Sequence, residues 1–376
     1  MHVVHLIKGL GPGGAERLIV NQLRTTDPSI RSTVLRVIPG KSHLVAEVEA
    51  TGATARIVGG GRFWPVGLHK QLRAEAPDVI HAHSPVMAVA ARLLRLTRRI
   101  DAPVITTEHN RWPRHHRATR TMNRLTAPLD AARIAVSHDV RDSMDTRLHS
   151  STTVLDHGVP LDELDALRTK RAEMRARLLG DRSDTHVVVG IVANFRPEKA
   201  YDVFLDAVEI ATQSDHRLTF LVVGQGPGES DFRSAVEARG FGDTIEVLGY
   251  RDDVLEVMSA FDIFTLSSRH EGKPVSLMEA FGLGLPVVAT RAGGIPEAVT
   301  HGVDGLLVDI DDRAGLAAGW IELAANPDQR VTMGQAAGVA AAGFDAAVST
   351  RSIESMYRSV VGDSGTGIPR ASSNDR

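Results

Sequence analysis

The chain has 376 residues, which is long enough for two domains that each bury a sizeable core. Its 43% hydrophobic and 24% charged residues are ordinary for a globular protein, and its net charge of −3 gives no bulk positive charge for nucleic acid. The absence of cysteine excludes disulfide bonds and cysteine-ligated zinc, and it fits a reducing compartment.

The first half alternates short apolar runs with helical segments, which predicts a parallel sheet covered by helices. The first run, Val3–Ile7, leads into the glycine-rich loop Gly11–Glu16 and a helix from Ala15 to about Leu23. Further strands are predicted at Ser32–Val37, Ala55–Ile57, Val79–Ala82, Val104–Thr107, Arg133–Val136 and Thr153–Leu155. Residues 1–165 are therefore expected to form a doubly wound, Rossmann-like domain.

A charged helical stretch, Leu161–Leu179, and a polar break, Gly180–Thr185, place a hinge near residues 158–186. A second series of strands is predicted at Val187–Val192, Leu218–Val223, Ile245–Leu248, Ile263–Leu266, Pro286–Ala289 and Gly305–Val308. Residues 166–345 should form a second domain of the same class, and a ligand should lie in the cleft between the two.

The end of the chain contains a predicted helix and a predicted tail. The helix spans Ala346–Val360, and residues 362–376 are rich in Gly, Ser and Pro, with little to bury, so we expect them to be disordered. At the other end, MHVVHLIKGL is too short and too interrupted for a signal peptide. No uncharged apolar run is long enough for a transmembrane helix.

Two loops at predicted strand ends could hold an anion. Gly13 and Gly14 let the backbone approach a ligand before a helix N-terminus, although a tight turn alone would also favour glycine. Arg196 and Lys199 follow the strand in Val189–Lys199, and a guanidinium beside an ammonium suits a pyrophosphate. A solvated loop is the alternative interpretation of this pair.

The segment Arg269–Ala280 places Glu271 and Glu279 around a Gly-Lys-Pro turn that opens into a helix. Pro274 suits the first helical position, where its missing N–H costs nothing. The free amides at this positive helix end are those near Gly272, Lys273 and Val275. Two carboxylates beside an anion site suit a ligand with both hydroxyls and phosphate, such as a nucleotide sugar.

The pattern HEG-x-P-x-x-L-x-EA at residues 270–280, followed by GLPVVAT-x-x-GG-x-PE at 284–297, resembles the donor half of family 4 retaining glycosyltransferases. The resemblance extends over about residues 1–360. It implies a GT-B fold, in which two Rossmann-like domains face each other across a cleft and the final helix packs back on the first domain. It also implies metal-independent, retaining transfer of a hexose-type sugar, without a cofactor, from a nucleotide-diphosphate sugar to a glycan, a lipid-linked acceptor or a small molecule.

The resemblance also suggests roles for individual residues. Lys199 matches the diphosphate-binding Lys of the family, whereas Asn194 stands where Arg is usual, and Arg196 could supply the missing guanidinium. Glu271 would hold sugar hydroxyls and Glu279 the ribose hydroxyls. The catalytic set is then His109, Arg196, Lys199 and Glu271. The donor-binding set is Gly13, Gly14, Asn194, Arg196, Lys199, Arg251, Gly272, Lys273, Pro274, Val275 and Glu279.

Two other functions remain open at this point. A nucleotide-sugar epimerase could use the same scaffold, and Asn194 in place of Arg would also fit a non-catalytic nucleotide-sugar-binding subunit. His81 and His83 share one face of a strand and could bind a metal, but no third ligand is evident, so we favour a structural or acceptor-side role. Asp309 and Asp311 precede a helix and are assigned to its capping. No metal site is therefore predicted.

The segment from Arg92 to Arg124 is strongly basic. It contains Arg92, Arg95, Arg98, Arg99, Arg111, Arg114, Arg117, Arg120 and Arg124, against only Asp101 and Glu108. Such a run is either a solvated face or a rim for an anionic bilayer or a lipid-phosphate-linked acceptor. Nucleic acid is not expected as a partner, because the 4% aromatic content offers few stacking platforms. We therefore expect a cytoplasmic protein, either free or at the inner face of the plasma membrane.

Overall fold

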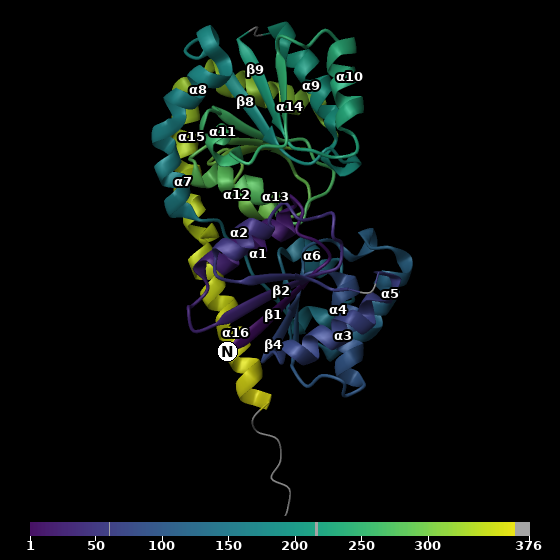
Figure 1. The fold of residues 1–376 in the computed structure, drawn as a ribbon. Coiled ribbons are helices and arrows are strands. Elements are labelled where there is room, and N and C mark those ends of the chain that lie inside the picture. Colours follow the sequence, from purple (N-terminus) through teal and green to yellow (C-terminus); the bar gives the residue numbers. More distant parts are fainter. Residues whose placement is uncertain (60, 215–216, 365–376) are drawn as a thin grey trace, which may run out of the picture.

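The computed structural model describes residues 1–59, 61–214 and 217–364, which form two α/β domains, the first below the second in Figure 1. The first domain contains a seven-stranded parallel sheet in the order β3-β2-β1-β4-β5-β6-β7. Its strands are β1 (His2–Ile7), β2 (Arg31–Arg36), β3 (Thr54–Ile57), β4 (Val79–Ala82), β5 (Val104–Glu108), β6 (Ala132–Ala135) and β7 (Thr152–Val154). Its helices are α1 (Gly14–Thr25), α2 (Val45–Ala50), α3 (Trp64–Glu75), α4 (Pro85–Leu96), α5 (Arg117–Thr126) and α6 (His138–Asp142).

The second domain contains a six-stranded parallel sheet in the order β10-β9-β8-β11-β12-β13. Its strands are β8 (Val187–Val192), β9 (Leu218–Val223), β10 (Ile245–Gly249), β11 (Ile263–Leu266), β12 (Val287–Thr290) and β13 (Gly305–Val308). The helices from the hinge onward are α7 (Leu161–Leu167), α8 (Arg171–Leu179), α9 (Tyr201–Ser214), α10 (Glu229–Ala238), α11 (Val254–Ser259), α12 (Val275–Gly282), α13 (Ile295–Ala298), α14 (Arg313–Ala325), α15 (Pro327–Ala340) and α16 (Ala346–Ser364).

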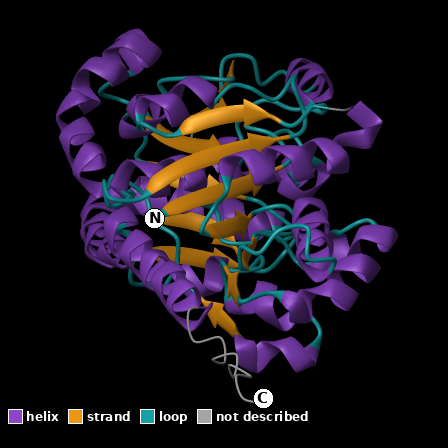
Figure 2. Cartoon of the chain, turned by 60° about the horizontal axis from the view of Figure 1, so that its bottom comes forward, coloured by secondary structure: helices purple, strands orange, loops and turns teal. Residues whose placement is uncertain are grey.

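The predicted fold class is confirmed, because both doubly wound parallel sheets are present and helices cover them, as Figure 2 shows with strands in orange and helices in purple. Each predicted strand is found within one residue of its expected ends. The strands were recognisable because they are buried on both faces: every residue of β1 and of β9 is buried. A strand covered on both faces must be apolar along most of its length, and such runs stand out in a sequence.

The strand order reverses at β1/β4 in the first sheet and at β8/β11 in the second. Ligands of doubly wound folds bind beyond the carboxyl ends of the strands at such switch points. The two switch points of this chain face each other, so the topology by itself defines where a shared ligand would lie.

The chain crosses between the domains twice at one place. Val159 N donates to Phe344 O at 2.8 Å, and Ala346 N donates to Val159 O at 3.1 Å, so the outgoing and returning segments are hydrogen-bonded to each other. Gly158 is required there, because a Cβ on it would lie 2.3 Å from Ala346 N. The α7 helix beyond the crossing packs on the second domain through Leu164.

The α16 helix, yellow in Figure 1, runs back along the first domain and packs against α1. Its Tyr357 is buried, and the hydroxyl lies 2.9 Å from Gln22 Nε2 and 2.6 Å from His81 Nδ1. Of the tail expected from Gly362 onward, residues 362–364 belong to this helix, so the start of that expectation was wrong. Residues 365–376 lie outside the described part of the chain. No described helix is both long and apolar enough to cross a membrane.

Candidate active site

A cleft of about 1150 Å³ lies between the domains, at the carboxyl ends of the central strands of both sheets. All of the residues that we proposed from the sequence as catalytic or donor-binding line this one cleft. From the first domain these are Gly13, Gly14 and His109. From the second they are Asn194, Arg196, Lys199, Arg251, Gly272, Lys273, Pro274, Val275, Glu271 and Glu279. Their placement follows from the topology, because each lies in the connection after a strand or within the helix that follows that strand.

An ion pair between Lys199 and Glu271 forms the floor of the cleft. Lys199 Nζ lies 2.5 Å from Glu271 Oε1, and the two side chains are only 19% and 8% exposed. Ser268 Oγ donates to the same carboxylate oxygen at 2.7 Å, and Ser267 Oγ donates to Lys199 O at 2.8 Å. Both charged groups are therefore held in place before any ligand arrives, with one edge of each facing the cleft.

The backbone around Glu271 is fixed by close contacts with neighbouring loops. Gly293 has a left-handed φ of 54°, and a Cβ on it would lie 2.0 Å from Glu271 O, so only glycine fits. A Cβ on Gly272 would lie 2.4 Å from His109 O, which belongs to the first domain. The loop that carries Glu271 therefore packs between the Gly293–Gly294 loop of its own domain and the His109 backbone of the first domain.

The α12 helix opens directly into the cleft. Pro274 is its N-cap residue, and the helix begins at Val275, one residue later than the sequence suggested. The side chain of Pro274 makes no capping hydrogen bond, and Val275 and Ser276 line the cleft. The first amides of a helix have no intrahelical partner and carry a partial positive charge, so this end can bind an anion.

Glu279 lies within α12 and is buried on the cleft wall. Burial raises the pKa of its carboxyl to about 7, and the nearby Arg17 guanidinium only partly opposes this shift. Arg17 belongs to α1 of the first domain and is itself paired with Glu47. Near neutral pH, Glu279 is therefore able both to accept and to donate a hydrogen bond, which suits a vicinal pair of hydroxyls.

The loop after β8 contributes the predicted cations. Arg196 is exposed in the cleft, and Asn194 Nδ2 donates to Pro12 O at 3.2 Å across it. Asn194 thus ties the glycine loop of the first domain to the cation loop of the second. This amide contact is a structural reason for asparagine at a position where the family usually has arginine.

The cleft contains charged residues that the sequence reasoning missed. Glu16 follows Gly13 and Gly14, and burial raises the pKa of its carboxyl, while Lys41 and Arg196 oppose the shift. Lys41 follows β2 and packs beside Gly9, where a Cβ would lie 2.7 Å from Lys41 Cβ. The signal for Lys41 was its position just past the carboxyl end of a strand next to the switch point.

Half-buried His109 lies at the cleft end of a group of buried imidazoles that extends inward. His83 Nδ1 lies 3.3 Å from His109 Nε2, and His5 Nδ1 lies 3.2 Å from His83 Nε2. Burial lowers the pKa of His109 to about 3 and that of His5 to about 4, so both are neutral at pH 7. A neutral His109 can donate or accept one hydrogen bond in the cleft without adding charge.

The structure supplies the third imidazole that the sequence did not reveal beside His81 and His83. Among the described residues, His5, His81 and His83 are buried with ring nitrogens within 4.8 Å of one another. Both nitrogens of His81 are nevertheless engaged, with Tyr357 Oη at 2.6 Å and Thr107 Oγ1 at 2.8 Å. These contacts make the cluster a hydrogen-bonded part of the core that joins α16 to the sheet.

Several predicted contacts have different details. Lys273 lines the cleft, but its side chain is ion-paired with Asp156 at the hinge and lies over the Phe344 ring, so it can serve a ligand only through its backbone. The residue that caps α14 is Asp312, which accepts from Gly315 N at 2.8 Å, and not Asp309 or Asp311. The prediction that Asp309 and Asp311 cap this helix was therefore wrong.

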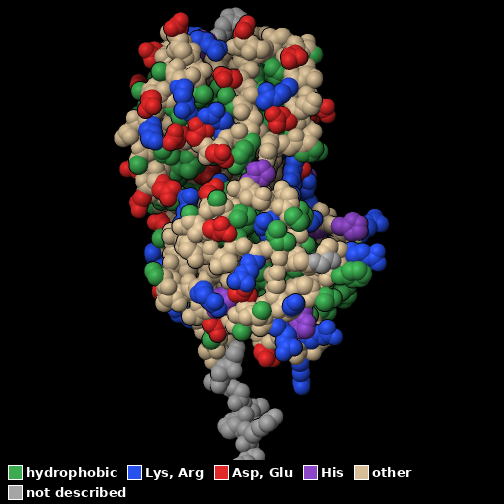
Figure 3. Space-filling model, in the orientation of Figure 1, with side chains coloured by type: hydrophobic (Ala, Val, Ile, Leu, Met, Phe, Trp, Pro, Cys, Tyr) green, Lys and Arg blue, Asp and Glu red, His purple; other side chains and the backbone are tan. Residues whose placement is uncertain are grey.

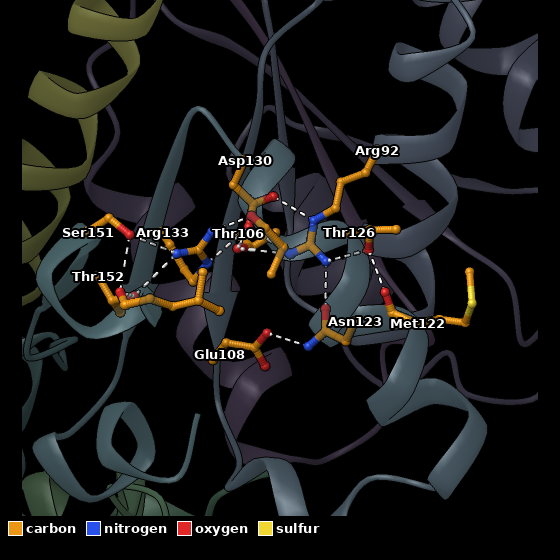
Figure 4. Close-up of polar contacts among 12 residues, drawn as sticks. Arg92, Thr106, Glu108, Met122, Asn123, Thr126, Asp130, Arg133, Ser151 and Thr152 are labelled. Atoms are coloured by element: carbon orange, nitrogen blue, oxygen red, sulfur yellow. Dashed lines mark hydrogen bonds and ion pairs between the residues drawn. The ribbon is translucent and has the colours of Figure 1, made fainter. Parts of the chain in front are cut away.

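The basic segment is not uniformly a surface rim, because Arg92 is buried. Its guanidinium binds Asp130 through Nε at 2.6 Å and through Nη2 at 2.7 Å, and Nη1 donates to Asn123 Oδ1 at 2.5 Å (Figure 4). Asp130 also accepts from Arg133 Nε at 3.1 Å. Including Arg92 in the rim was wrong: its helical position points into the sheet, where a bidentate carboxylate satisfies it.

Comparison with known proteins agrees with the geometry. Residues 1–163 match the family "Glycosyltransferase Family 4", and residues 186–326 match "Glycosyl transferases group 1". The chain is 33% identical over 156 residues to N-acetyl-alpha-D-glucosaminyl L-malate synthase of Bacillus anthracis, a match that spans 41% of this chain and 40% of the relative. It is 24% identical over 343 residues to alpha-D-kanosaminyltransferase of Streptomyces kanamyceticus, spanning 87% and 88% of the two chains.

A solved structure of HepE from Anabaena in complex with UDP-glucose superposes on this chain with a TM-score of 0.80. The two sequences are 22% identical, and the superposition covers 96% of this chain and 100% of HepE. At this level of identity the likeness establishes the shared two-domain fold.

Proposed function

We propose that this chain, which belongs to family 4 of the glycosyltransferases and has the GT-B fold, transfers a hexose-type sugar from a nucleotide-diphosphate sugar with retention of anomeric configuration. The observation that carries the proposal is the Lys199–Glu271 pair, which lies beside the uncapped start of α12 in the cleft between the domains. A cation, a carboxylate and free amides at one place match the leaving phosphate and the sugar hydroxyls of such a donor.

In the proposed complex, the diphosphate lies between the cation loop and α12. Lys199 and Arg196 would neutralise its charge from one side, and the amides around Val275 from the other. Glu271 would turn its free edge toward the sugar hydroxyls, and Glu279 would hold the ribose hydroxyls. HepE has been solved with UDP-glucose, so a UDP-sugar is the first donor to test.

The proposed reaction needs no side chain as nucleophile. The acceptor hydroxyl oxygen attacks the anomeric carbon from the face that the diphosphate leaves, the bond from that carbon to the diphosphate oxygen breaks, and the acceptor proton moves to the departing phosphate. The products are a glycoside with retained configuration and a nucleoside diphosphate. Negative charge grows on the leaving phosphate, so the groups that hold it stabilise the transition state more than the ground state.

We propose that these cations replace a divalent metal in this role. Lys199 is fixed by Glu271, and Arg196 is exposed at the cleft and has no ion-pair partner among the described residues. An ammonium and a guanidinium in a partly dry cleft offer the same two positive charges that a magnesium ion would bring to a diphosphate.

The acceptor is proposed to be a glycan, a lipid-linked sugar or a small molecule that enters from the first domain. Arg111 and Arg114 line the cleft on that side, as do Ser84 and Pro85, and the two arginines are ion-paired with Asp139 and Glu198. They are positioned to meet an anionic acceptor such as one linked to a phosphate.

The proposal is tested by incubating the enzyme with a UDP-, GDP- or ADP-sugar and candidate acceptors, and by following the anomeric proton by NMR. Release of nucleoside diphosphate together with a glycoside of the donor's configuration supports the proposal. A C2 epimer of the donor would establish the epimerase alternative, and donor binding without turnover over a broad acceptor set would establish the non-catalytic one. Inverted configuration, or a sugar covalently trapped on a carboxylate, would overturn the proposed mechanism.

A further inference from the structure

Three helices of the first domain, α3, α4 and α5, carry an unusual share of the exposed apolar side chains. Seven of the 13 large hydrophobic side chains that the described residues expose lie between positions 61 and 125. Four of them are more than 60% exposed, namely Phe63, Val66, Leu96 and Leu125. The other three are Val86, Leu93 and Met122. Scattered exposed apolar groups need no explanation, but this concentration does.

The segment that contains these helices also carries an excess of positive charge. Residues 61–125 contain 12 Lys and Arg against four Asp and Glu, in a chain whose net charge is −3. Arg92, Glu75 and Glu108 are buried, which leaves 11 cations against two acids, Asp78 and Asp101. Within the described residues, the exposed cations Arg62, Lys70, Arg73, Arg99 and Arg117 have no ion-pair partner, whereas surface arginines of the second domain such as Arg233, Arg239 and Arg313 are paired.

The three helices form one face. Leu68 and Leu72 of α3 pack in the same buried cluster as Met87 and Ala88 of α4, and α4 packs on α5. In Figure 1 the three lie together at the right of the lower domain, and Figure 3 shows green and blue side chains along that edge. We call this surface, formed by the exposed residues of α3, α4, α5 and residues 61–63, the α3–α5 face.

We propose that the α3–α5 face docks the enzyme on an anionic lipid bilayer. In a membrane interface, acyl chains lie beneath negatively charged headgroups. The exposed apolar side chains would contact the acyl chains, and the cations around them would bind the headgroups. A second copy of the chain fits poorly, because two such faces would bring like charges together. A purely polyanionic partner would use the cations and leave Phe63, Leu96 and Leu125 without a role.

The position of the face connects it to the cleft, and this step rests on the proposed function. The α4 helix begins at Pro85 in the cleft wall, and α5 begins three residues after the cleft residue Arg114. A bilayer on the α3–α5 face would therefore lie beside the acceptor entrance. The acceptor class that this geometry favours is a saccharide held at the membrane surface by a lipid phosphate.

The test is flotation of the full chain with vesicles at low salt, without donor or acceptor. Vesicles of phosphatidylglycerol and phosphatidylcholine are compared with phosphatidylcholine alone. The double variant Arg99→Gln/Arg117→Gln should lower partitioning about 25-fold, at about fivefold per cation. Its control, Arg182→Gln/Arg351→Gln, removes two cations elsewhere and should leave partitioning unchanged.

The apolar contribution is tested separately. Leu96→Ser/Leu125→Ser should lower partitioning about tenfold or more, because both side chains lose buried area in the bilayer. The matched control Val331→Ser/Val339→Ser changes two exposed valines of α15, 59% and 78% exposed, and should have no effect. Circular dichroism of all four variants checks that they are folded.

Three results would overturn the proposal. The first is that the unmodified chain does not partition into anionic vesicles at low salt, and the second is that the face variants and the control variants lose partitioning equally. The third is that Leu96→Ser/Leu125→Ser partitions as well as the unmodified chain and that soluble heparin displaces it from the vesicles. The last result would indicate a polyanion partner. Donor titration on the same proteins reports on the proposed function independently, since flotation needs no donor. If the protein floats with the vesicles but binds no nucleotide sugar, the proposed function is refuted and the membrane-docking proposal is still supported.

Discussion

Replacing Lys199 by Ala should remove most of the affinity for the donor, through the loss of one charge-assisted hydrogen bond. The ammonium is held 2.5 Å from Glu271 in a site where both side chains are largely buried. A hydrogen bond to a charged partner contributes about 1.5–3 kcal/mol, so the dissociation constant of the nucleotide sugar should rise about 10- to 150-fold. Isothermal titration calorimetry with the donor measures this directly.

The same substitution also leaves Glu271 as a buried carboxylate without its cation, which can cost about 3–5 kcal/mol of folding free energy. A loss of donor binding could then come from local unfolding. The double variant Lys199→Ala/Glu271→Gln removes both charges and should recover most of the stability, measured as the midpoint of urea unfolding. It should not recover donor affinity.

Two results would refute the reasoning about this pair. The first is an unchanged donor titration for Lys199→Ala, which would mean that the ammonium does not contact the diphosphate. The second is full donor affinity in Lys199→Ala/Glu271→Gln, which would mean that the pair serves only the fold. Arg233→Ala, at an exposed ion pair of α10, is the matched control and should change neither quantity by more than a small amount.

Three further predictions follow from the site. Buried His157 lies beside His109, with ring centroids 5.7 Å apart. Burial lowers the pKa of both His5 and His157 from 6.5 to about 4, so the unfolded chain binds more protons between these values, and folding stability should fall as pH drops through this window, by up to about 3 kcal/mol for each. An unchanged urea midpoint between pH 7 and pH 5 would contradict this. Glu279→Gln should weaken donor binding and remove the part of its pH dependence that is centred near pH 7, since burial places the pKa of that carboxyl there; calorimetry across pH 6 to 8 in both proteins decides it. Chelation with EDTA should leave transferase activity unchanged in product assays, because Arg196 and Lys199 would provide the positive charge; activity that is lost with EDTA and restored by magnesium would contradict the metal-independent mechanism.

The sequence was sufficient for the fold because the strands carry their signal locally. A strand such as β9, LTFLVV, is covered by helices on both faces, so every position is apolar or nearly so, and a turn residue follows. The set of cleft residues was accessible for a related reason: in parallel sheets all strand ends at one edge meet, so residues after different strands must lie together. Lys199 and Glu271 are separated by 72 positions, but they follow the adjacent strands β8 and β11, and their side chains form an ion pair.

What the sequence did not reveal depends on contacts between distant segments. Arg92, Arg95 and Arg98 follow one another at three-residue steps, so the sequence does not distinguish the buried arginine from the others. Only the fold shows that Asp130 lies opposite Arg92. His5 could not be connected to His81 and His83 from the sequence. Its strand β1 pairs with their strand β4, but β2 and β3 lie between the two in the chain. The role of Asn194 was similarly hidden, since its partner is a carbonyl of Pro12 in the other domain.

The return of α16 to the first domain has a consequence for how the protein is made. A nascent chain that has emerged as far as residue 345 has every strand of both sheets but lacks Ile353 and Tyr357, which fill the core beneath β1, β4 and β5. The half that is synthesised first can therefore be completed only after α16 has been synthesised, whereas the described hydrophobic cluster of the second half ends at Phe344. Polypeptides that end prematurely near position 345 should carry a stable nucleotide-binding half joined to an unfinished one, which makes them natural targets for chaperones and proteases.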